Sequence, residues 1–554
     1  MSQRSHGTAS SASLASLADE YLRGLFDTYP AHAASLGLHE YDGQVQDYSD
    51  AARADWATTL SSFAARLAAL DIGALDPDGV HDYTLLRLAA ADEIFDLTSL
   101  CEVEYNLMAF SGSLDVSGYV KRTYAPVADR VERLTEHLRQ FPRVLASARR
   151  LLRRPVPAPI LQASLETYVG LVRFHEEELP AAARAAGPGP IWTSFERANA
   201  DALGALRAFV AYLGDELRPR TTEAFAIGPE RFETMLRLGE MVDLPLDRLR
   251  EIGRDNLARN RARLEGVVGR IAPGATMADV VRRLSRDHPS AVRLVPEAAR
   301  VLDELREFLV IRGIVSIGSD ARLRVEPTPP FARWAFAMMD TAGPFETAPE
   351  SFYYVTPPDP AWTAEATEEW LRKFDYATLR DVGIHEVYPG HYVHFLAVRG
   401  VPRRLRRVLT SYSCVEGWAH YCEEMMLDAG YRDGDDGLPV AQLLEALPRN
   451  VRLEVAIEMH TREMTVREAA LRFAEDAFLE PLPAEKEAVR GTLDPGYLNY
   501  TLGKLMLQKL RDDVRTAEGA GFALRGFHDR LLSLGAPPIP LARRALLAHP
   551  GAAL

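Results

Sequence analysis

The chain contains 554 residues, of which 47% are hydrophobic and 26% are charged, proportions typical of globular proteins. This composition excludes a disordered or fibrous protein, and the length allows one large domain or several ordinary ones. Lysine and arginine number 64 against 78 aspartate and glutamate residues, and the resulting net charge of −14 argues against a nucleic-acid-binding protein.

The N-terminal segment is rich in serine and has no hydrophobic periodicity, which predicts a disordered tail over residues 1–13. It lacks the apolar core of a signal peptide, and nowhere does the chain approach 18 uninterrupted apolar residues. Three cysteines are too few for a disulfide framework in a chain of this size. We therefore expect a cytoplasmic protein with neither nucleic acid nor membrane as a partner.

From Leu14 onward the dominant pattern is helical. In Ala51–Leu70 the apolar residues recur at steps of three and four, as on the buried face of an amphipathic helix. The same spacing predicts helices over Tyr83–Leu97, Val127–Leu152, Ile160–Leu179, Phe195–Leu217, Leu246–Ile271 and Ala299–Arg312. Because no long linker interrupts this pattern, we expect a single, mainly α-helical domain over residues 14–554.

Two short stretches interrupt the helical pattern. Arg322–Pro327 and Ser351–Pro357 are rich in residues that favour strands, and both end in proline. They predict a small antiparallel sheet just upstream of the histidine-rich part of the chain. The aromatic cluster Phe352–Tyr354 either forms part of the core or provides an edge strand that binds an extended peptide.

Histidines gather in one part of the sequence. Five of the 14 lie between residues 385 and 460, namely His385, His391, His394, His420 and His460. The first two flank the sequence His-Glu-Val-Tyr-Pro-Gly-His. Zinc hydrolases commonly carry His-Glu-x-x-His on one helix, with both histidines on one face and the glutamate as general base. Here the second histidine comes two residues later, about 120° away on an unbroken helix.

Pro389 and Gly390 change this geometry. Proline removes a helical N–H group and clashes with the preceding turn, so the helix must break or restart there. A restart at this point can return His391 to the side of His385, with Gly390 allowing a close approach of the chain. The motif is thus compatible with a metal site because of its Pro-Gly insert.

A second motif follows about 25 residues downstream, in Cys414–Met425. A catalytic zinc site with two histidines needs a third protein ligand, and a carboxylate from a following helix is a common choice. Glu416, His420 and Glu423 share one face of the expected helix. We assign Glu416 as the third ligand and Glu423 as a residue that does not bind the metal but orients an imidazole through a hydrogen bond.

Together, HEVYPGH and EGWAHYCEEM resemble the bacterial domain-of-unknown-function 885 family, whose signature is His-Glu-x-x-Pro-Gly-His followed by Glu-Gly-Trp-Ala. Weaker similarity extends along nearly the whole chain, for example in Leu36–Asp42 and Tyr500–Lys504. Tyr392 and His394 depart from the family, which usually has His and Gln there. The resemblance therefore says more about the metal than about the substrate.

The family is grouped with gluzincin-type zinc metallopeptidases. The resemblance implies a large helical domain with a central cleft, similar to zinc peptidases of the neurolysin and angiotensin-converting-enzyme type. It also implies that His385, His391 and Glu416 bind one zinc ion per chain, with the site contained in residues 385–423. Glu386 falls on the family's general base.

A zinc hydrolase also needs a hydrogen-bond donor for the oxyanion that forms when water attacks a carbonyl. Tyr500, His460 and Arg452 are the candidates, since each lies in a stretch that matches the family. His394 and His420 are expected either to support the ligands from behind or to be structural, and not to bind the metal themselves.

We therefore expect a zinc-dependent hydrolase, a metallopeptidase that cleaves peptide bonds with Glu386 as general base and a peptide or small amide as substrate. Two alternatives remain open. One is a zinc hydrolase of a non-peptide amide or another small metabolite, and the other is a helical binding scaffold with a vestigial metal site. Cleavage position, side-chain preference and oligomeric state are not indicated by the sequence.

Overall fold

The computed structural model describes residues 2–319, 323–329, 333, 336–348 and 350–554, with side chains from residue 10 onward. These residues group into two compact units. The first comprises Met1–Arg231 and Ala342–Glu350, and the second comprises Phe232–Thr341 and Ser351–Leu554. The division was not anticipated by the expectation of one domain over residues 14–554.

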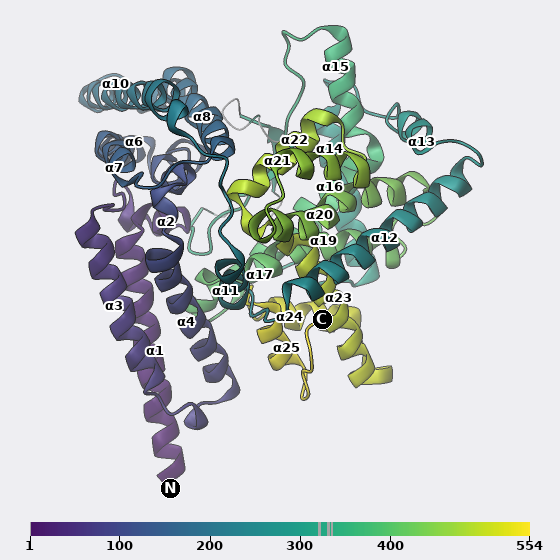
Figure 1. Cartoon of the computed structure of the whole chain (residues 1–554), viewed down its shortest axis with the longest axis horizontal. Helices are drawn as coiled ribbons and strands as arrows, with labels where there is room; N and C mark the ends of the chain where they lie inside the picture. The colour runs from purple at the N-terminus through teal and green to yellow at the C-terminus, as the bar shows by residue number, and fades with distance from the viewer. Residues whose placement is uncertain (1, 320–322, 330–332, 334–335, 349) are drawn as a thin grey trace. The chain divides into compact units, whose positions relative to one another are not determined.

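The first unit is built from α-helices joined by short 3₁₀ and π segments. The helices are α1 (Ser2–Thr28), α2 (Pro30–Ser35), α3 (Asp50–Ala68), α4 (Pro77–Phe95), α5 (Gly118–Lys121), α6 (Val127–Leu138), α7 (Phe141–Leu151), α8 (Ala158–Arg173), α9 (Leu179–Ala183) and α10 (Pro190–Ala211). Within this unit α3 packs against α4 and α1, and α10 packs against α6, α7 and α8 (Figure 1).

The helical pattern of the sequence locates most of these elements. In α3 the expected stripe is buried, and the helix begins where the Ser49 side chain accepts a hydrogen bond from the Ala52 N–H. The helix expected over Val127–Leu152 is instead two helices, because Pro142 lies in the first turn of α7. Helix α1 continues back to Ser2, across the segment for which we expected a disordered tail, and Met1 lies outside the described residues.

Residues 342–350 return to the first unit after a long excursion of the chain. The Phe345 N–H donates to the Leu36 carbonyl at 2.9 Å, and His39 Nε2 lies 3.0 Å from a Glu346 carboxylate oxygen. A Cβ atom on Gly343 would lie 2.5 Å from the Leu36 carbonyl, so a side chain at that position would displace the segment. The Leu36–Asp42 stretch that resembles the family motif thus serves as the docking point of this segment.

The second unit holds the remaining helices, and the chain enters it within α11. They are α11 (Pro229–Gly239), α12 (Leu246–Ile271), α13 (Met277–Leu284), α14 (Leu294–Arg312), α15 (Ala364–Leu371), α16 (Tyr376–Glu386), α17 (His391–Gly400), α18 (Arg404–Val408), α19 (Tyr412–Asp428), α20 (Gly437–Thr461), α21 (Val466–Asp476), α22 (Pro481–Leu493), α23 (Asn499–Glu518), α24 (Leu524–Leu532) and α25 (Ile539–Leu546).

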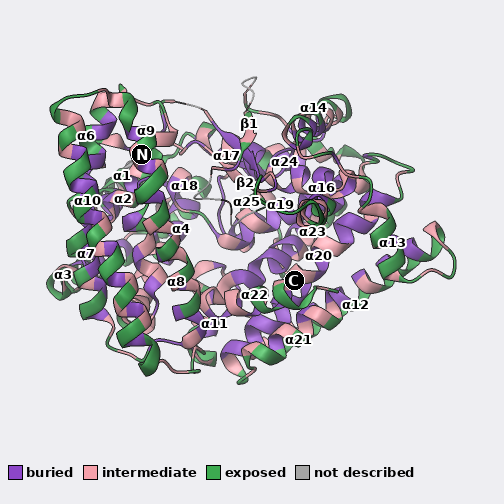
Figure 2. Cartoon of the chain, turned by 90° about the horizontal axis from the view of Figure 1, so that it is seen from above, coloured by how far each residue is buried: buried purple, intermediate pink, exposed green. Residues whose placement is uncertain are grey.

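The core of the second unit lies around α19 and α20. Helix α19 packs against α23, and α20 packs against α12 and α16. In Figure 2 buried residues run along α19 and α20, whereas α13 carries mainly exposed ones. Gly417 on α19 and Gly503 on α23 allow the backbones of these two helices to come into contact, since a Cβ on Gly417 would lie 2.5 Å from the Gly503 Cα atom.

A three-stranded sheet completes the second unit. Its strands are β1 (Arg324–Pro327), β2 (Ala337–Asp340) and β3 (Phe352–Val355), in the order β1-β3-β2. The pair β1–β3 is parallel and the pair β2–β3 is antiparallel, so the sheet is mixed. We had expected an antiparallel sheet. Because β3 is central and buried, Phe352–Tyr354 does not provide an edge strand. Arg322, which we placed in the first strand, lies outside the described residues.

Among the described residues, no helix combines the length and the apolar composition needed to cross a membrane.

Candidate metal centre

Three residues of the second unit bring possible metal-binding atoms together. His385 lies at the end of α16, His391 begins α17 and Glu416 lies one turn into α19. One ligand atom from each lies within 4.8 Å of the others, and no other such group of three occurs in the part of the chain that the structure describes. Three helices therefore meet at one point of convergent polar atoms.

The Pro-Gly insert separates α16 from α17. Helix α16 ends at Glu386, the chain turns through Pro389 and Gly390, and α17 restarts at His391. A Cβ atom on Gly390 would lie 1.7 Å from the His385 carbonyl oxygen, so only glycine fits there. The turn brings the two imidazole rings to a centroid separation of 5.0 Å, nearly perpendicular to each other.

The Glu-Gly-Trp motif of α19 is tied to this turn. The Trp418 indole N–H lies 3.0 Å from the Pro389 carbonyl oxygen and 3.3 Å from that of Gly390, and it donates to both. Gly417 allows the approach of α23 described above. Trp418 and Gly417 thus hold α19 through different contacts, and the position of Glu416 depends on both of them.

The start of α19 is fixed by a buried carboxyl group. Glu240, just beyond α11, accepts hydrogen bonds from the Ser413 N–H at 3.2 Å and from the hydroxyl groups of Ser411 and Ser413. Burial raises the pKa of Glu240, and the hydrogen bonds from the two serines oppose this shift. Because this carboxyl group holds the first turn, the register of Glu416 relative to the histidines is set by contacts deep in the unit.

The ligand atoms themselves face one another. Glu416 Oε2 lies 3.3 Å from His391 Nε2 and 3.7 Å from His385 Nε2. Burial alone would raise the pKa of Glu416, but the two imidazoles hold it well below its usual range. Burial and Arg449 lower the pKa of His385, yet Glu416 and Glu423 raise it to about 9. The group therefore favours positive charge between its members.

These properties match what zinc requires. Two neutral imidazole Nε2 atoms and one carboxylate oxygen form a known catalytic zinc set, which leaves a further position for water. His385, His391 and Glu416 thus fit a divalent metal in donor type, in direction and in charge.

Glu423 supports His385 from behind. Its Oε1 atom lies 2.7 Å from His385 Nδ1, and its Oε2 atom lies 2.8 Å from His420 Nδ1. Burial would raise the pKa of Glu423, but Arg449 at 3.7 Å and the two histidines lower it well below its usual range. An ionised Glu423 accepts the Nδ1 proton of His385, so the Nε2 atom is left free to bind a metal.

Glu386 follows His385 directly in the chain and is half-buried. The Met339 N–H of strand β2 donates to Glu386 Oε2 at 3.2 Å, which directs the carboxyl group along the edge of the sheet. In the register of the sheet Met339 is opposite Tyr353. Because β2 is an edge strand of the described sheet, its free edge lies next to the carboxyl group expected to act as base.

Tyr500 stands over the other side of the group. Its ring is nearly parallel to the His385 ring, with centroids 6.5 Å apart. Burial and the charge of Glu416 raise its pKa, so the phenol keeps its proton at neutral pH. Arg490 Nη2 donates to the phenol oxygen at 3.2 Å, and among the described residues no acceptor takes the phenol hydrogen. Tyr500 can therefore donate a hydrogen bond to a further group.

The other two candidate oxyanion donors are engaged elsewhere. Arg452 donates through Nε and Nη2 to both carboxylate oxygens of Glu487, at 2.7 and 2.8 Å. The Nε2 atom of His460 lies 2.7 Å from the Gly491 carbonyl oxygen, and its ring stacks on Phe232. Burial lowers the pKa of His460 to about 4. Both residues thus contribute to the packing of α20.

The two remaining histidines are fully buried. His394 Nε2 lies 3.4 Å from the Gly535 carbonyl oxygen, and His420 binds Glu423 through Nδ1. Burial lowers the pKa of His394 to about 4 and that of His420 to about 3. His394 is thus engaged by the Gly535 carbonyl, whereas His420 is linked to His385 through Glu423.

The sequence argument missed three residues near the centre. Tyr412 lies one helical turn before Glu416, a spacing that could have identified it. Arg449 and Arg490 lie on α20 and α22, and no local pattern connects them to the histidine motif. Only the packing of the helices brings these two arginines close.

The fold and the three-residue group define a mainly α-helical protein with a candidate metal centre. The chain belongs to the family described as bacterial protein of unknown function (DUF885), whose family model matches residues 30–546. No curated protein matches the chain.

Two solved structures share the fold. A candidate lipoprotein of unknown function from Shewanella oneidensis is 21% identical, with a TM-score of 0.79 over 96% of this chain and 99% of that one. A candidate lipoprotein from Colwellia psychrerythraea is 18% identical, with a TM-score of 0.80 over 97% of this chain and 98% of that one. At this identity the likeness shows the fold alone.

The descriptions of these two structures correct one expectation. Lipoproteins are anchored to membranes by attached lipid, and both structural relatives are described as candidates for that class. The prediction of a cytoplasmic location, which depended on the absence of a recognisable signal, is therefore wrong, and we withdraw it.

Proposed function

We propose that this chain is a zinc-dependent hydrolase that cleaves peptide bonds. The observation that carries the proposal is the convergence of His385 Nε2, His391 Nε2 and a Glu416 oxygen on one point, with ligand atoms within 4.8 Å of one another. A second, uncoordinated carboxyl group, that of Glu386, follows His385 directly in the chain. Ligands and a separate acid–base group are the minimum equipment of a metallohydrolase.

His385, His391 and Glu416 would hold the metal. Bound zinc supplies a Lewis acid that polarises a carbonyl group and lowers the pKa of water. Glu386 accepts the proton of the attacking water and delivers it to the leaving amine. Tyr500 donates its hydrogen bond to the oxygen that gains negative charge, while Glu423 keeps His385 in the correct tautomer.

The edge of the sheet favours a peptide over a small metabolite. Met339 on β2 contacts Glu386, so an extended chain that pairs with the free edge of β2 would pass the acid–base group. Edge strands bind extended peptides through backbone hydrogen bonds, and such binding is largely independent of side chains. A small non-peptide amide would leave this edge unused.

Metal analysis of untagged protein tests the first part of the proposal. We expect about one zinc per chain after gel filtration, and we expect His391→Ala to remove most of it. His394→Ala is the matched control, because it changes the same residue type one turn along α17 and should leave zinc content unchanged. Zinc retained by His391→Ala and lost by His394→Ala would refute the ligand assignment.

A peptide library tests the second part. The zinc-loaded protein is incubated with short peptides of mixed sequence, and products are identified by mass spectrometry. Cleavage that disappears on metal removal and returns with added zinc is the expected result. Bound zinc without any peptide cleavage would favour a hydrolase of non-peptide amides, and absence of zinc would favour the scaffold.

A further inference from the structure

Arg490 lies at the accessible edge of the candidate metal centre. It belongs to α22, and 36% of its side chain is exposed. Its Nη2 atom donates to Tyr500 and Tyr412 hydroxyl oxygens, both at 3.2 Å, and to Asp494 Oδ2 at 3.3 Å. One nitrogen of the guanidinium thus fixes its position, and three oxygens hold that nitrogen.

The contacts of the two tyrosines place this guanidinium beside the ligand group. Tyr500 stacks over His385 with ring centroids 6.5 Å apart, and the Tyr412 ring centroid lies 5.8 Å from that of Tyr500. Tyr412 lies one turn before Glu416 on α19. The Arg490 guanidinium carbon lies 5.5 Å from the centroid of the Tyr500 ring, so the same ring contacts both Arg490 and His385. Two extended residues span roughly 7 Å, a length on the scale of one aromatic ring and its contacts.

Three arginines face the Tyr500 ring, but they differ in which of their N–H groups are still free to bind a ligand. The Arg452 guanidinium is 4.9 Å from the ring and binds Glu487 through two nitrogens. Arg449 lies 6.0 Å from the ring, is largely buried and faces the Glu423 carboxylate. Among the described residues, the Nε and Nη1 atoms of Arg490 have no hydrogen-bond or ion-pair partner.

An exposed guanidinium with free N–H groups is suited to a carboxylate. Charge-assisted hydrogen bonds to a carboxylate are stronger than neutral ones, and the free Nε and Nη1 atoms, which point to different sides of the guanidinium, can each donate one. Arg490 is held in position before any ligand arrives, so little side-chain entropy remains to be lost on binding. Asp494 uses only the Nη2 side of the group.

We infer that Arg490 binds the C-terminal carboxylate of the substrate, and that the enzyme removes one or two residues from the C-terminal ends of peptides. This inference rests on the proposed peptidase function and adds the substrate class. The carboxylate would sit beside Arg490, with the scissile carbonyl one or two residues away at the ligand group. Internal peptide bonds would not place a carboxylate there.

Two peptide mixtures that differ at one group test the inference. One mixture of random tetrapeptides carries free C-terminal carboxylates, and the other carries C-terminal amides. The zinc-loaded Glu386→Gln protein, expected to bind without turnover, is exposed to each, and retained peptides are quantified by mass spectrometry. We expect the acids to be retained roughly 10- to 100-fold better than the amides, and less so at high salt.

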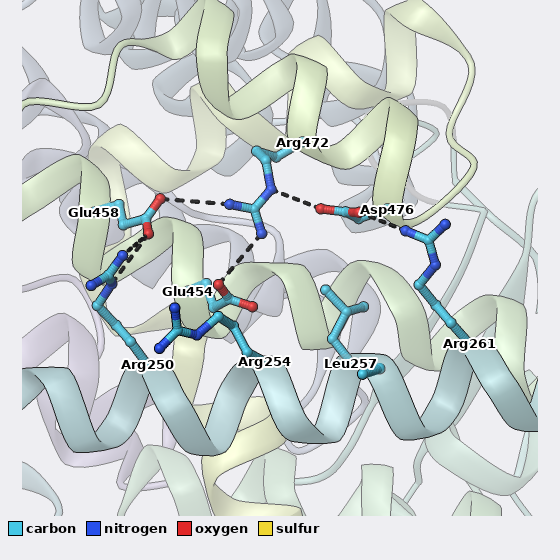
Figure 3. Close-up of a pocket in the computed structure, with 9 residues that line it drawn as sticks. Arg250, Arg254, Leu257, Arg261, Glu454, Glu458, Arg472 and Asp476 are labelled. Atoms are coloured by element: carbon cyan, nitrogen blue, oxygen red, sulfur yellow. Dashed lines mark hydrogen bonds and ion pairs between the residues drawn. The ribbon is translucent and has the colours of Figure 1, made fainter.

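Variants of Arg490 locate the effect. Arg490→Met in the Glu386→Gln background should abolish the preference for acids, and Arg490→Lys should preserve part of it because the charge remains. Arg254→Met is the matched control, since Arg254 is an exposed arginine that lines a groove of the second unit and forms no hydrogen bond or ion pair with another described residue (Figure 3). That variant should retain the full preference.

Turnover by the wild-type chain separates the two proposals. Cleavage of the acid mixture with a lower KM than the amide mixture supports the role of Arg490. Equal retention and equal cleavage of acids and amides would overturn that role and leave the peptidase function standing. If zinc-loaded protein cleaves neither mixture, the peptidase function fails and the inference fails with it.

Discussion

Two regions of the second unit gather charged side chains from distant helices, and they differ in whether those charges are satisfied. At the metal centre a Glu416 carboxylate oxygen lies 3.7 Å from His385 Nε2 and 3.3 Å from His391 Nε2. In the groove of Figure 3, about 390 Å³ in volume, arginines of α12 and α21 line a wall with acids of α20 and α21.

Pairing in the groove is extensive. Arg472 contacts all three acids, with Nε donating to Asp476 at 2.7 Å and Nη1 3.7 Å from Glu458. Arg250 and Arg261 bind the other sides of Glu458 and Asp476. The groove contains more charged residues than the metal centre, but each of its carboxylates already forms an ion pair with an arginine. A binding site is therefore indicated by ligand atoms without partners, and not by the number of charged residues.

The largest effects are expected from substitutions of Glu386 and Glu416, the two glutamates associated with the histidines. Glu386→Gln should retain zinc and the fold but lose hydrolysis by roughly 10²–10⁴-fold, because only an acid–base group is removed. Glu416→Gln should weaken zinc binding itself, so excess zinc should restore part of its activity. Zinc content and turnover of both variants, with and without added zinc, are the measurements.

The opposite behaviour would reverse the roles of these residues. Metal loss from Glu386→Gln, together with a fully loaded but inactive Glu416→Gln, would make Glu386 the ligand. Full activity in both variants would contradict the metallohydrolase proposal.

A smaller effect is expected from the residue behind His385. Glu423→Gln removes the ionised acceptor of the Nδ1 proton, and loss of such partners weakens metal affinity by roughly 10- to 100-fold. Glu424→Gln is the matched control, since the neighbouring carboxylate binds Lys504 at 2.8 Å and Arg263 instead of a histidine. Competition with a zinc chelator gives both affinities, and equal values would remove Glu423 from the centre.

The sequence predicts the parts of the centre that depend on local spacing. His385, Glu386 and His391 are close in the chain, so the geometry of one interrupted helix was sufficient to relate them. Glu416 followed from the need for a third ligand on the next helix. Arg490 was beyond reach because α22 approaches Tyr500 only through tertiary packing.

The fold shows the same limit. Helix α12 was predicted with its observed bounds, since its periodic pattern is long. The place of β3 in the centre of a mixed sheet was not predicted, because four-residue strands carry little information about strand order. The return of residues 342–350 to the first unit depends on contacts with Leu36, which are remote in the sequence.

The groove should respond to mutation through stability alone. Arg472→Met removes the partner of Glu454, Glu458 and Asp476 together, and we expect a loss of about 1–2 kcal/mol in the free energy of unfolding. Zinc content should stay unchanged. Arg254→Met, which removes no ion pair among the described residues, should change stability by less than about 0.5 kcal/mol. Denaturant unfolding and metal analysis of both variants provide the check, and zinc loss from Arg472→Met would contradict the separation of the two regions.

The smallest effect concerns the one acid of the groove that is incompletely paired. Glu454 is 1% exposed, its Oε2 atom accepts from Arg472 at 3.4 Å and its Oε1 atom has no partner among the described residues. Burial raises the pKa of Glu454, and Arg472 offsets this shift only in part. The folded protein therefore retains this proton at pH values where the unfolded chain releases it, and the free energy of unfolding falls as the pH rises through that interval.

Glutamine cannot ionise, so Glu454→Gln should be slightly more stable than the wild type at pH 7. The gap should narrow as the pH falls towards the ordinary pKa of a glutamate, about 4.3. Glu458→Gln should have the opposite sign at pH 7, because Glu458 is bound by both Arg250 and Arg472. Urea unfolding of the two variants and the wild type between pH 5 and 8 measures both signs. A loss of stability in Glu454→Gln as large as that in Glu458→Gln would mean that Glu454 is fully paired in the folded protein. Every acid of the groove would then be satisfied, in contrast to the ligand atoms of the metal centre.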